Sequence, residues 1–185
     1  MPIKIIKKGI IITARPSLSL DIFNRSVILI VEHTDNGSIG FILNKPTHIP
    51  VNIFTSQIDS PQIVYEGGPV EKENIFYVHR RPDLIQNSVW VKDDIYWGGE
   101  YDDIIYAIRN SLFKEDDIKF YLGYSGWSKN QLEDELINSN AWEIIEDYDF
   151  DLFETWENDL WQKSLKKLGG ENLIWLNTPF DPSMN

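Results

Sequence analysis

Histidine and its polar neighbours are the residues of this chain whose types suit acid–base chemistry. The three histidines show no H-x-x-x-H spacing. His33 directly follows Glu32, but adjacent strand residues point to opposite faces, so a direct Glu–His dyad is not expected. An enzyme would use His33 or Glu32 as a base, with Ser26 or Tyr124 nearby. The alternative is that His33 is a core residue with satisfied hydrogen bonds.

A serine lies between glycines in the segment Gly123–Trp127, GYSGW. This is not a nucleophile elbow, because that turn needs G-x-S-x-G and here glycine follows serine directly. Ser128 lies three residues before Gln131, which predicts a capping box at a helix start, and Trp127 with Leu132 predicts a hydrophobic staple. The free amide groups of such a helix start could bind an anion.

Paired glycines occur in a second segment, EGGPV at residues 66–70. They let the backbone approach another group closely, which is more often a strand than a phosphate. No Lys-Ser/Thr follows, which excludes a P-loop, and no G-x-G-x-x-G exists in the chain. The sequence therefore gives only weak support for nucleotide binding.

Turn and strand-end residues are expected to gather around one cleft that binds a small ligand or a protein partner, whose identity is unknown. The expected ligand-binding residues are Ser26, Asn44, Gly67, Gly68, Tyr124 and Trp127, and the further candidates are Glu32, His33 and Gln131. No residue is assigned as catalytic.

No metal or cofactor is expected. The chain has no cysteine, which excludes disulfides and thiolate metal sites and suits a reducing compartment. Asp147, Asp149 and Asp151 resemble the start of a calcium loop, but the sixth position is Leu152 where glycine is required. This segment is interpreted as a solvated acidic connection.

Charge limits the class of partner. Twenty-nine acidic residues against 17 Lys and Arg give a formal net charge of −12. Such a chain repels the phosphate backbone, so direct nucleic-acid binding is not expected. No apolar run is long enough for a membrane span, and the N-terminal apolar stretch is too short for a signal peptide. We expect a cytoplasmic protein that forms one domain over residues 1–185.

A β-hairpin is the firmest local prediction. Ser26–His33 and Ser38–Asn44 have the composition of strands, and Asp35-Asn36-Gly37 is typical of a tight turn. If Asn36-Gly37 forms a two-residue turn, His33 lies opposite Gly40. Strand alternation then places one set of side chains on one face, namely Leu29, Val31, His33, Ile42 and Asn44. The other face carries Ser26, Ile28, Ile30, Glu32 and Phe41.

The remaining pattern favours an α+β fold. Strands are predicted at residues 9–13, 62–65, 74–80, 89–91, 95–97, 118–124 and near 142–145. Helices are predicted at residues 101–112, 129–138 and 156–168. Several strands precede most of the helices, which favours a mixed, largely antiparallel sheet with about three flanking helices over a doubly wound parallel sheet.

Several of these segments together resemble the AlgH (YqgE) family. The resemblance runs from about residue 9 to 169 and is carried by the blocks PSL at 16–18, FNRSV at 23–27, VEH at 31–33, GFILNKP at 40–46, YEGGPV at 65–70 and LGYSGW at 122–127, with a closing helix from Trp161 to Gly169. Two positions depart from the family pattern: Arg15 stands where an apolar residue is usual, and Asn130 where glycine is common.

The resemblance implies a bent, split sheet that closes towards a pseudo-barrel. It also brings the label of transcriptional regulator, but no established activity. The leading hypothesis is a cytosolic AlgH-like protein that acts by binding a small ligand or a protein. The alternatives are an enzyme of unknown reaction using a cleft around His33, Glu32 and Ser26, and a regulator that binds DNA directly.

Overall fold

The longest strand, β9 (Ile118–Ser128), belongs to both halves of the sheet. In the computed structural model, which describes residues 5–16 and 22–178, the first part of β9 pairs with β5 and β6 and its last part pairs with β3. Between these parts Gly123 has φ +67°, and an added Cβ would lie 2.7 Å from the carbonyl oxygens of Gly68 and Val70. Glycine is therefore required where β9 passes from one half to the other.

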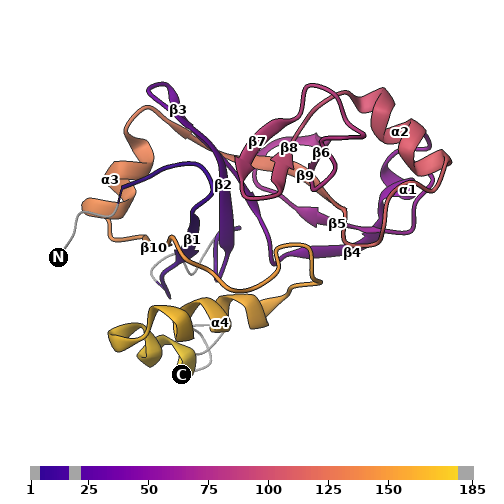
Figure 1. Cartoon of the computed structure of the whole chain (residues 1–185). Helices are drawn as coiled ribbons and strands as arrows, with labels where there is room; N and C mark the ends of the chain where they lie inside the picture. The colour runs from indigo at the N-terminus through magenta and orange to yellow at the C-terminus, as the bar shows by residue number, and fades with distance from the viewer. Residues whose placement is uncertain (1–4, 17–21, 179–185) are drawn as a thin grey trace.

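The predicted strands and helices occur in the predicted order, and a strand at 46–50, a short helix at 51–54 and a 3₁₀-helix at 170–177 occur in addition (Figure 1). The strands are β1 (Ile11–Ala14), β2 (Val27–Thr34), β3 (Gly37–Ile42), β4 (Pro46–Pro50), β5 (Ile63–Glu66), β6 (Val70–His79), β7 (Val89–Lys92), β8 (Ile95–Trp97) and β10 (Trp142–Ile145). The helices are α1 (Val51–Phe54), α2 (Tyr101–Arg109), α3 (Gln131–Ile137), α4 (Asn158–Leu168) and the 3₁₀-helix η2 (Gly170–Asn177).

The strands form a ten-stranded sheet in the order β10-β1-β2-β3-β9-β6-β8-β7, with β4 and β5 joined to it through β9. All pairs are antiparallel except β5 with β9. The α+β class and the mixed, largely antiparallel sheet are confirmed. The sheet is not closed into a barrel, because β10 and β7 lie at the two ends of the strand order and do not pair with each other.

The hairpin exists, but the predicted register is wrong. Thr34 pairs with Gly37, so the turn is Asp35-Asn36, and a bulge at Val31 shifts the pairing beyond it. Gly37 belongs to β3 because it lies against β9: an added Cβ would lie 2.1 Å from the Trp127 carbonyl oxygen. The slip reverses the faces of β3. Leu29 and Val31 share a cluster with Phe41, whereas Ile28 and Ile30 share one with Ile42.

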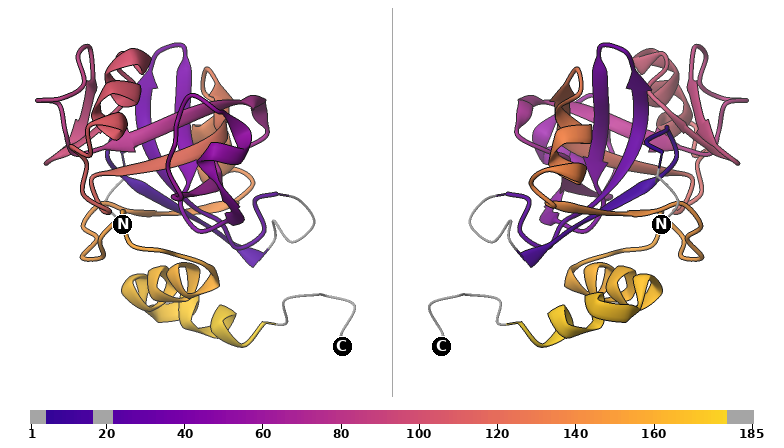
Figure 2. Two further views of the ribbon diagram at one scale, coloured as in Figure 1. Left: turned by 90° about the vertical axis from the view of Figure 1, so that its right-hand side faces the viewer. Right: turned by 90° about the vertical axis from the view of Figure 1, so that its left-hand side faces the viewer.

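The three main helices lie on different flanks of the sheet, with α3 and α2 at opposite ends and α4 along one side (Figures 1 and 2). Helix α3 begins at Gln131, later than predicted, because Asn130 has the left-handed φ of +61°. Gln131 Oε1 accepts the Ser128 N–H at 3.0 Å, as predicted, but the N-cap is Asn130 and not Ser128, so the capping box is not formed. Trp127 and Leu132 pack in one cluster, but with this N-cap they do not occupy the two predicted staple positions.

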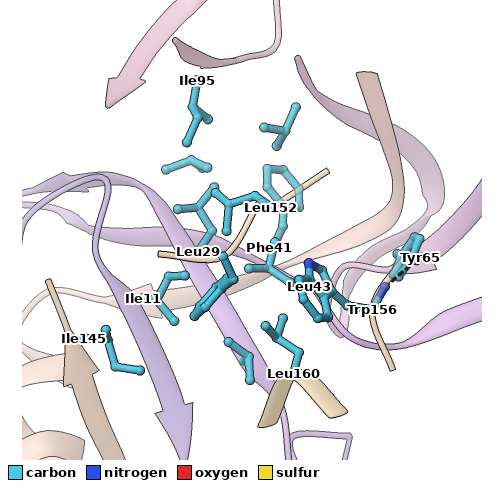
Figure 3. Packing of buried hydrophobic residues seen from close by; sticks show 14 of the residues in the cluster. Ile11, Leu29, Phe41, Leu43, Tyr65, Ile95, Ile145, Leu152, Trp156 and Leu160 are labelled. Atoms are coloured by element: carbon cyan, nitrogen blue, oxygen red, sulfur yellow. Dashed lines mark hydrogen bonds between the residues drawn. The ribbon is translucent and has the colours of Figure 1, made fainter. Parts of the chain in front are cut away.

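Three apolar clusters fill the interior. The main one lies between the two halves of the sheet and α4, and Figure 3 shows side chains such as Leu29, Phe41 and Leu160 converging there. A second lies among β1, β2, β10 and α3, and a third lies under α2. The Trp161 indole of α4 donates to the Ala14 carbonyl at 2.8 Å, which fixes α4 against β1. In the parts of the chain that the structure describes, no helix is long and apolar enough to cross a bilayer.

Candidate functional site

A cleft of about 900 Å³, which we call the Lys119 cleft, is the larger of two concavities described here. Three segments distant in sequence line it, within residues 59–65, 108–119 and 151–155. Gln62 links two of these segments, because its Nε2 donates to the Glu115 carbonyl at 2.9 Å. A concavity of this size is in the range of small-ligand sites.

Lys119 is the buried charged residue of this cleft. Strand alternation places Ile118 and Phe120 in the cluster under α2 and turns Lys119 to the other face, towards Tyr65. Only 6% of Lys119 is exposed. Its Nζ donates to the carbonyls of Glu154 at 2.8 Å and Leu152 at 3.3 Å.

The Lys119 amine has aromatic and backbone partners where an ion pair would be usual. Its Nζ lies 3.9 Å from the centroid of the Tyr65 ring. Burial lowers the pKa of Lys119 to about 7, and the more distant carboxylates of Asp151 and Glu154 only partly offset this. Asp151 is bound elsewhere, since both of its oxygens accept from Arg80, at 2.7 and 3.3 Å.

Tyr65 and Asp151 position the wall around the amine. The Tyr65 hydroxyl accepts the Trp156 N–H at 3.2 Å, and Figure 3 shows the two side chains next to each other at the edge of the main cluster. Burial also raises the pKa of Tyr65. Arg80 holds Asp151 and also lies near Asp94 and Asp116, at 3.1 and 3.7 Å. The segment 151–155 is therefore held at both of its ends, by Arg80 at Asp151 and by Tyr65 at the adjacent Trp156.

A second concavity of about 420 Å³ lies between the β2–β3 hairpin and β9, and we call it the hairpin groove. Three of the expected ligand residues line it, namely Glu32, Tyr124 and Trp127. His33 is not among the lining residues. Its Nδ1 lies 2.9 Å from Ser38 Oγ, and its Nε2 lies 3.8 Å from Glu133 of α3. Gln131 Nε2 donates to Glu135 at 2.9 Å, so its amide supports α3.

Two other expected ligand residues, Asn44 and Ser26, lie inside the fold and do not line either concavity. Asn44 accepts the Val27 N–H and donates to the Arg25 carbonyl, both at 2.9 Å, so its amide ties the chain beyond β3 to the start of β2. Ser26, beside it, is buried completely, and among the described residues its hydroxyl has no hydrogen-bond partner.

Gly67 and Gly68 pack against β9. An added Cβ at Gly67 would lie 2.1 Å from the Gly123 carbonyl oxygen, and one at Gly68 would lie 2.2 Å from Tyr124 backbone atoms. The Ser125 hydroxyl donates to the Gly67 carbonyl at 3.0 Å. The glycine-containing blocks therefore meet in space, as expected, but at Gly67 and Gly68 the close neighbour is a strand.

The sequence prediction did not include the Lys119 cleft. The available signal was Lys119 itself, a lone charge inside the apolar strand IKFYL at 118–122. A second buried titratable group, His79, lies in β6, where its ring accepts the Arg81 N–H at 3.1 Å and contacts the Gly98 carbonyl at 3.1 Å. Among residues 5–16 and 22–178, no three His, Asp or Glu side chains are grouped to hold a metal ion.

These features define a class: an α+β protein with a split, mostly antiparallel sheet joined by one long strand. Residues 11–173 match the sequence profile of the AlgH-like family, DUF179, and the chain belongs to this family. The family assignment made from the sequence is confirmed.

Relatives and solved structures agree. A UPF0301 protein of Cytophaga hutchinsonii is 37% identical, covering 96% of this chain and 98% of its own. UPF0301 protein CT0663 of Chlorobaculum tepidum is 35% identical over 98% of this chain and 97% of its own. Neither name states an activity.

Two solved structures share the fold. Protein DIP2367 of Corynebacterium diphtheriae has a TM-score of 0.77 at 19% identity, covering 96% of this chain and 95% of its own. The AlgH protein of Pseudomonas aeruginosa has a TM-score of 0.71 at 23% identity, covering 92% and 93%.

Proposed function

We propose that this protein binds a small polar ligand in the Lys119 cleft and that any regulatory effect it has follows from that binding, without direct contact to DNA. The observation that carries the proposal is the buried Lys119 amine, with backbone carbonyl partners, in the wall of a cleft of about 900 Å³. Desolvating an amine is costly, and such groups gather at functional sites more often than elsewhere. The proposal includes a cytosolic location, on the basis of the cysteine-free sequence.

The charge of the cleft favours uncharged or cationic ligands. Its lining carries five carboxylates, of Asp59, Glu115, Asp116, Asp151 and Glu154, against the amines of Lys114 and Lys119. Together with the net charge of −12, this lining repels anions. Nucleotides and phosphorylated metabolites are therefore poor candidates, although the helix start at α3 first suggested an anion.

The alternatives receive less support. For an enzyme built from Ser26 and His33, the two residues are seven positions apart along extended chain, which is roughly 20 Å. Ser26 is also completely buried. For direct DNA binding, the acidic charge opposes the phosphate contacts that supply most affinity. The hairpin groove remains the alternative surface, for a small ligand or a protein partner.

A ligand screen tests the proposal. Thermal shift and titration calorimetry would compare panels of uncharged, cationic and anionic small metabolites on the whole chain. We expect hits among uncharged or cationic compounds, and Lys119→Met is expected to weaken them about tenfold or more through the lost hydrogen bond.

The matched control is Asn36→Ala, because Asn36 is exposed in the hairpin groove and distant from the Lys119 cleft. It is expected to leave the same hits unchanged. Hits that are lost in Asn36→Ala and retained in Lys119→Met would move the site to the hairpin groove, and a screen in which only anions bind would contradict the proposed ligand class.

A further inference from the structure

We propose that Lys119 is a reactive amine that captures an uncharged aldehyde or ketone in the cleft as an imine. This inference rests on the proposed ligand-binding function and specifies its ligand class. It uses the position of one nitrogen, the acceptors around it and the open cleft beside it.

The contacts of Lys119 suit a neutral amine as well as an ammonium ion. The carbonyls of Leu152 and Glu154 can accept the two hydrogens of a neutral amine, which leaves its lone pair unshared. The Tyr65 ring at 3.9 Å favours the protonated form instead. The nearest acid, Asp151, would also favour the protonated form, but it is bound to Arg80. The contacts around Lys119 are therefore compatible with both the neutral and the protonated amine.

The reaction needs no oxidant, reductant or metal. The lone pair of Lys119 Nζ attacks the carbonyl carbon, a C–N bond forms, and the carbonyl oxygen takes up a proton to give a carbinolamine. The nitrogen loses one proton to leave the carbinolamine neutral, and it loses its second proton as the hydroxyl takes up a proton, the C–O bond breaks and water leaves, so that an imine remains. The open mouth of the cleft supplies solvent for the proton and receives the released water.

Burial gives this amine an advantage over surface lysines. It lowers the pKa of Lys119 to about 7. At neutral pH about half of such an amine is neutral, against roughly one part in two thousand for an ordinary lysine. A desolvated lysine is a recognised form of activated nucleophile.

Reductive trapping on the full chain tests the inference. Propionaldehyde and sodium cyanoborohydride would be added at neutral pH, and peptide mass mapping would locate each propylated lysine over time. We expect Lys119 to react about tenfold faster than Lys114, since the larger neutral fraction outweighs the hindered access. Lys114 is the internal control, because it is an exposed lysine of the same cleft.

The pH profile supplies a readout that a purely structural lysine would not give. The rate at Lys119 should level off above about pH 7, whereas an ordinary surface lysine keeps gaining reactivity up to about pH 10. In urea the selectivity should disappear. Propylation of surface lysines with Lys119 untouched, or equal rates at every lysine, would overturn the inference. This mapping uses the wild-type chain, so a variant that fails to fold cannot obscure it.

Failure of the inference is separable from failure of the proposed function. If uncharged compounds bind and Lys119→Met weakens them, but no adduct forms on Lys119, the binding function stands and imine capture is wrong. If neither binding nor an adduct is found, both are wrong.

Discussion

His79 has no exposed surface, and both of its ring nitrogens contact backbone groups. Because Nδ1 accepts the Arg81 N–H, the other nitrogen carries the hydrogen and donates to the Gly98 carbonyl. Burial lowers the pKa of His79 to about 4. The fold thus holds a neutral histidine, which explains why this residue has a structural role despite its reactive type.

The depressed pKa of His79 predicts a pH-dependent stability. Its contribution is complete above the unfolded pKa of about 6.5 and is lost as pH falls towards about 4, because the unfolded chain takes up the proton first. A shift of this size corresponds to about 3 kcal/mol. Urea unfolding would be measured at both ends of this pH range. Between them, the free energy of unfolding of His79→Gln should fall by about 3 kcal/mol less than that of wild type. Equal losses in the two proteins would contradict this prediction. The carboxylates titrate in both proteins, so their contribution to the pH dependence cancels in the comparison.

The elements are joined by backbone contacts that only glycine permits. The loop between β5 and β6 lies against β9 through Gly67 and Gly68, and Gly68 has φ +155°. Two contacts of Arg15 also tie later elements to the sheet. Arg15 of the β1 end pairs with Glu143 of β10 and lies over Trp175 of η2, 5.2 Å from its ring centroid. This contact explains a charged residue where the family usually has an apolar one.

A substitution at Gly68 tests the glycine junction. In Gly68→Ala the new Cβ would lie 2.2 Å from Tyr124 backbone atoms, so β9 must shift. We expect a loss of about 3 kcal/mol or more in free energy of unfolding, measured by urea titration. The control is Gly126→Ala on the exposed side of β9, where an added Cβ meets side chains and no backbone among its nearest neighbours, namely the Tyr124 ring at 3.2 Å and Val70 Cγ2 at 3.7 Å. A Gly68→Ala protein as stable as this control would show that β9 can shift at this junction with little loss of stability.

At the element scale the sequence predicted more than at the residue scale. The periodicity at residues 101–112 and 156–168 predicted α2 and α4, because an amphipathic face is a local pattern. The start of α3 was less accurate, since Asn130 adopts a left-handed conformation that sequence spacing does not reveal. A glycine, common at this position in the family, would adopt that conformation without strain.

The whole molecule combines two half-sheets that share one strand and one core. The main cluster contains Leu29 and Val31 of β2 together with Val91 and Ile95 of β7 and β8. Neither half can lose its structure without exposing this shared apolar surface. The acidic charge is also a property of the whole molecule, because the net charge of −12 acts on every approaching partner.

We therefore expect the two half-sheets to unfold together. Urea transitions followed by far-ultraviolet circular dichroism and by tryptophan fluorescence should coincide, since Trp142 and Trp161 report on one half and Trp90 and Trp97 on the other. Two separated transitions would show that β9 does not couple the halves.

The sequence by itself determined the α+β class, the order of the elements and the acidic charge, and through its ordered blocks it indicated the family. These follow from local periodicity, turn chemistry and composition, which do not depend on distant contacts. Only the tertiary structure decided the hairpin register, because the contact of Gly37 with β9 and the bulge at Val31 fix it. The Lys119 cleft also needed the fold, since its three segments are separated by roughly 30 residues or more and meet only when β9 is in place.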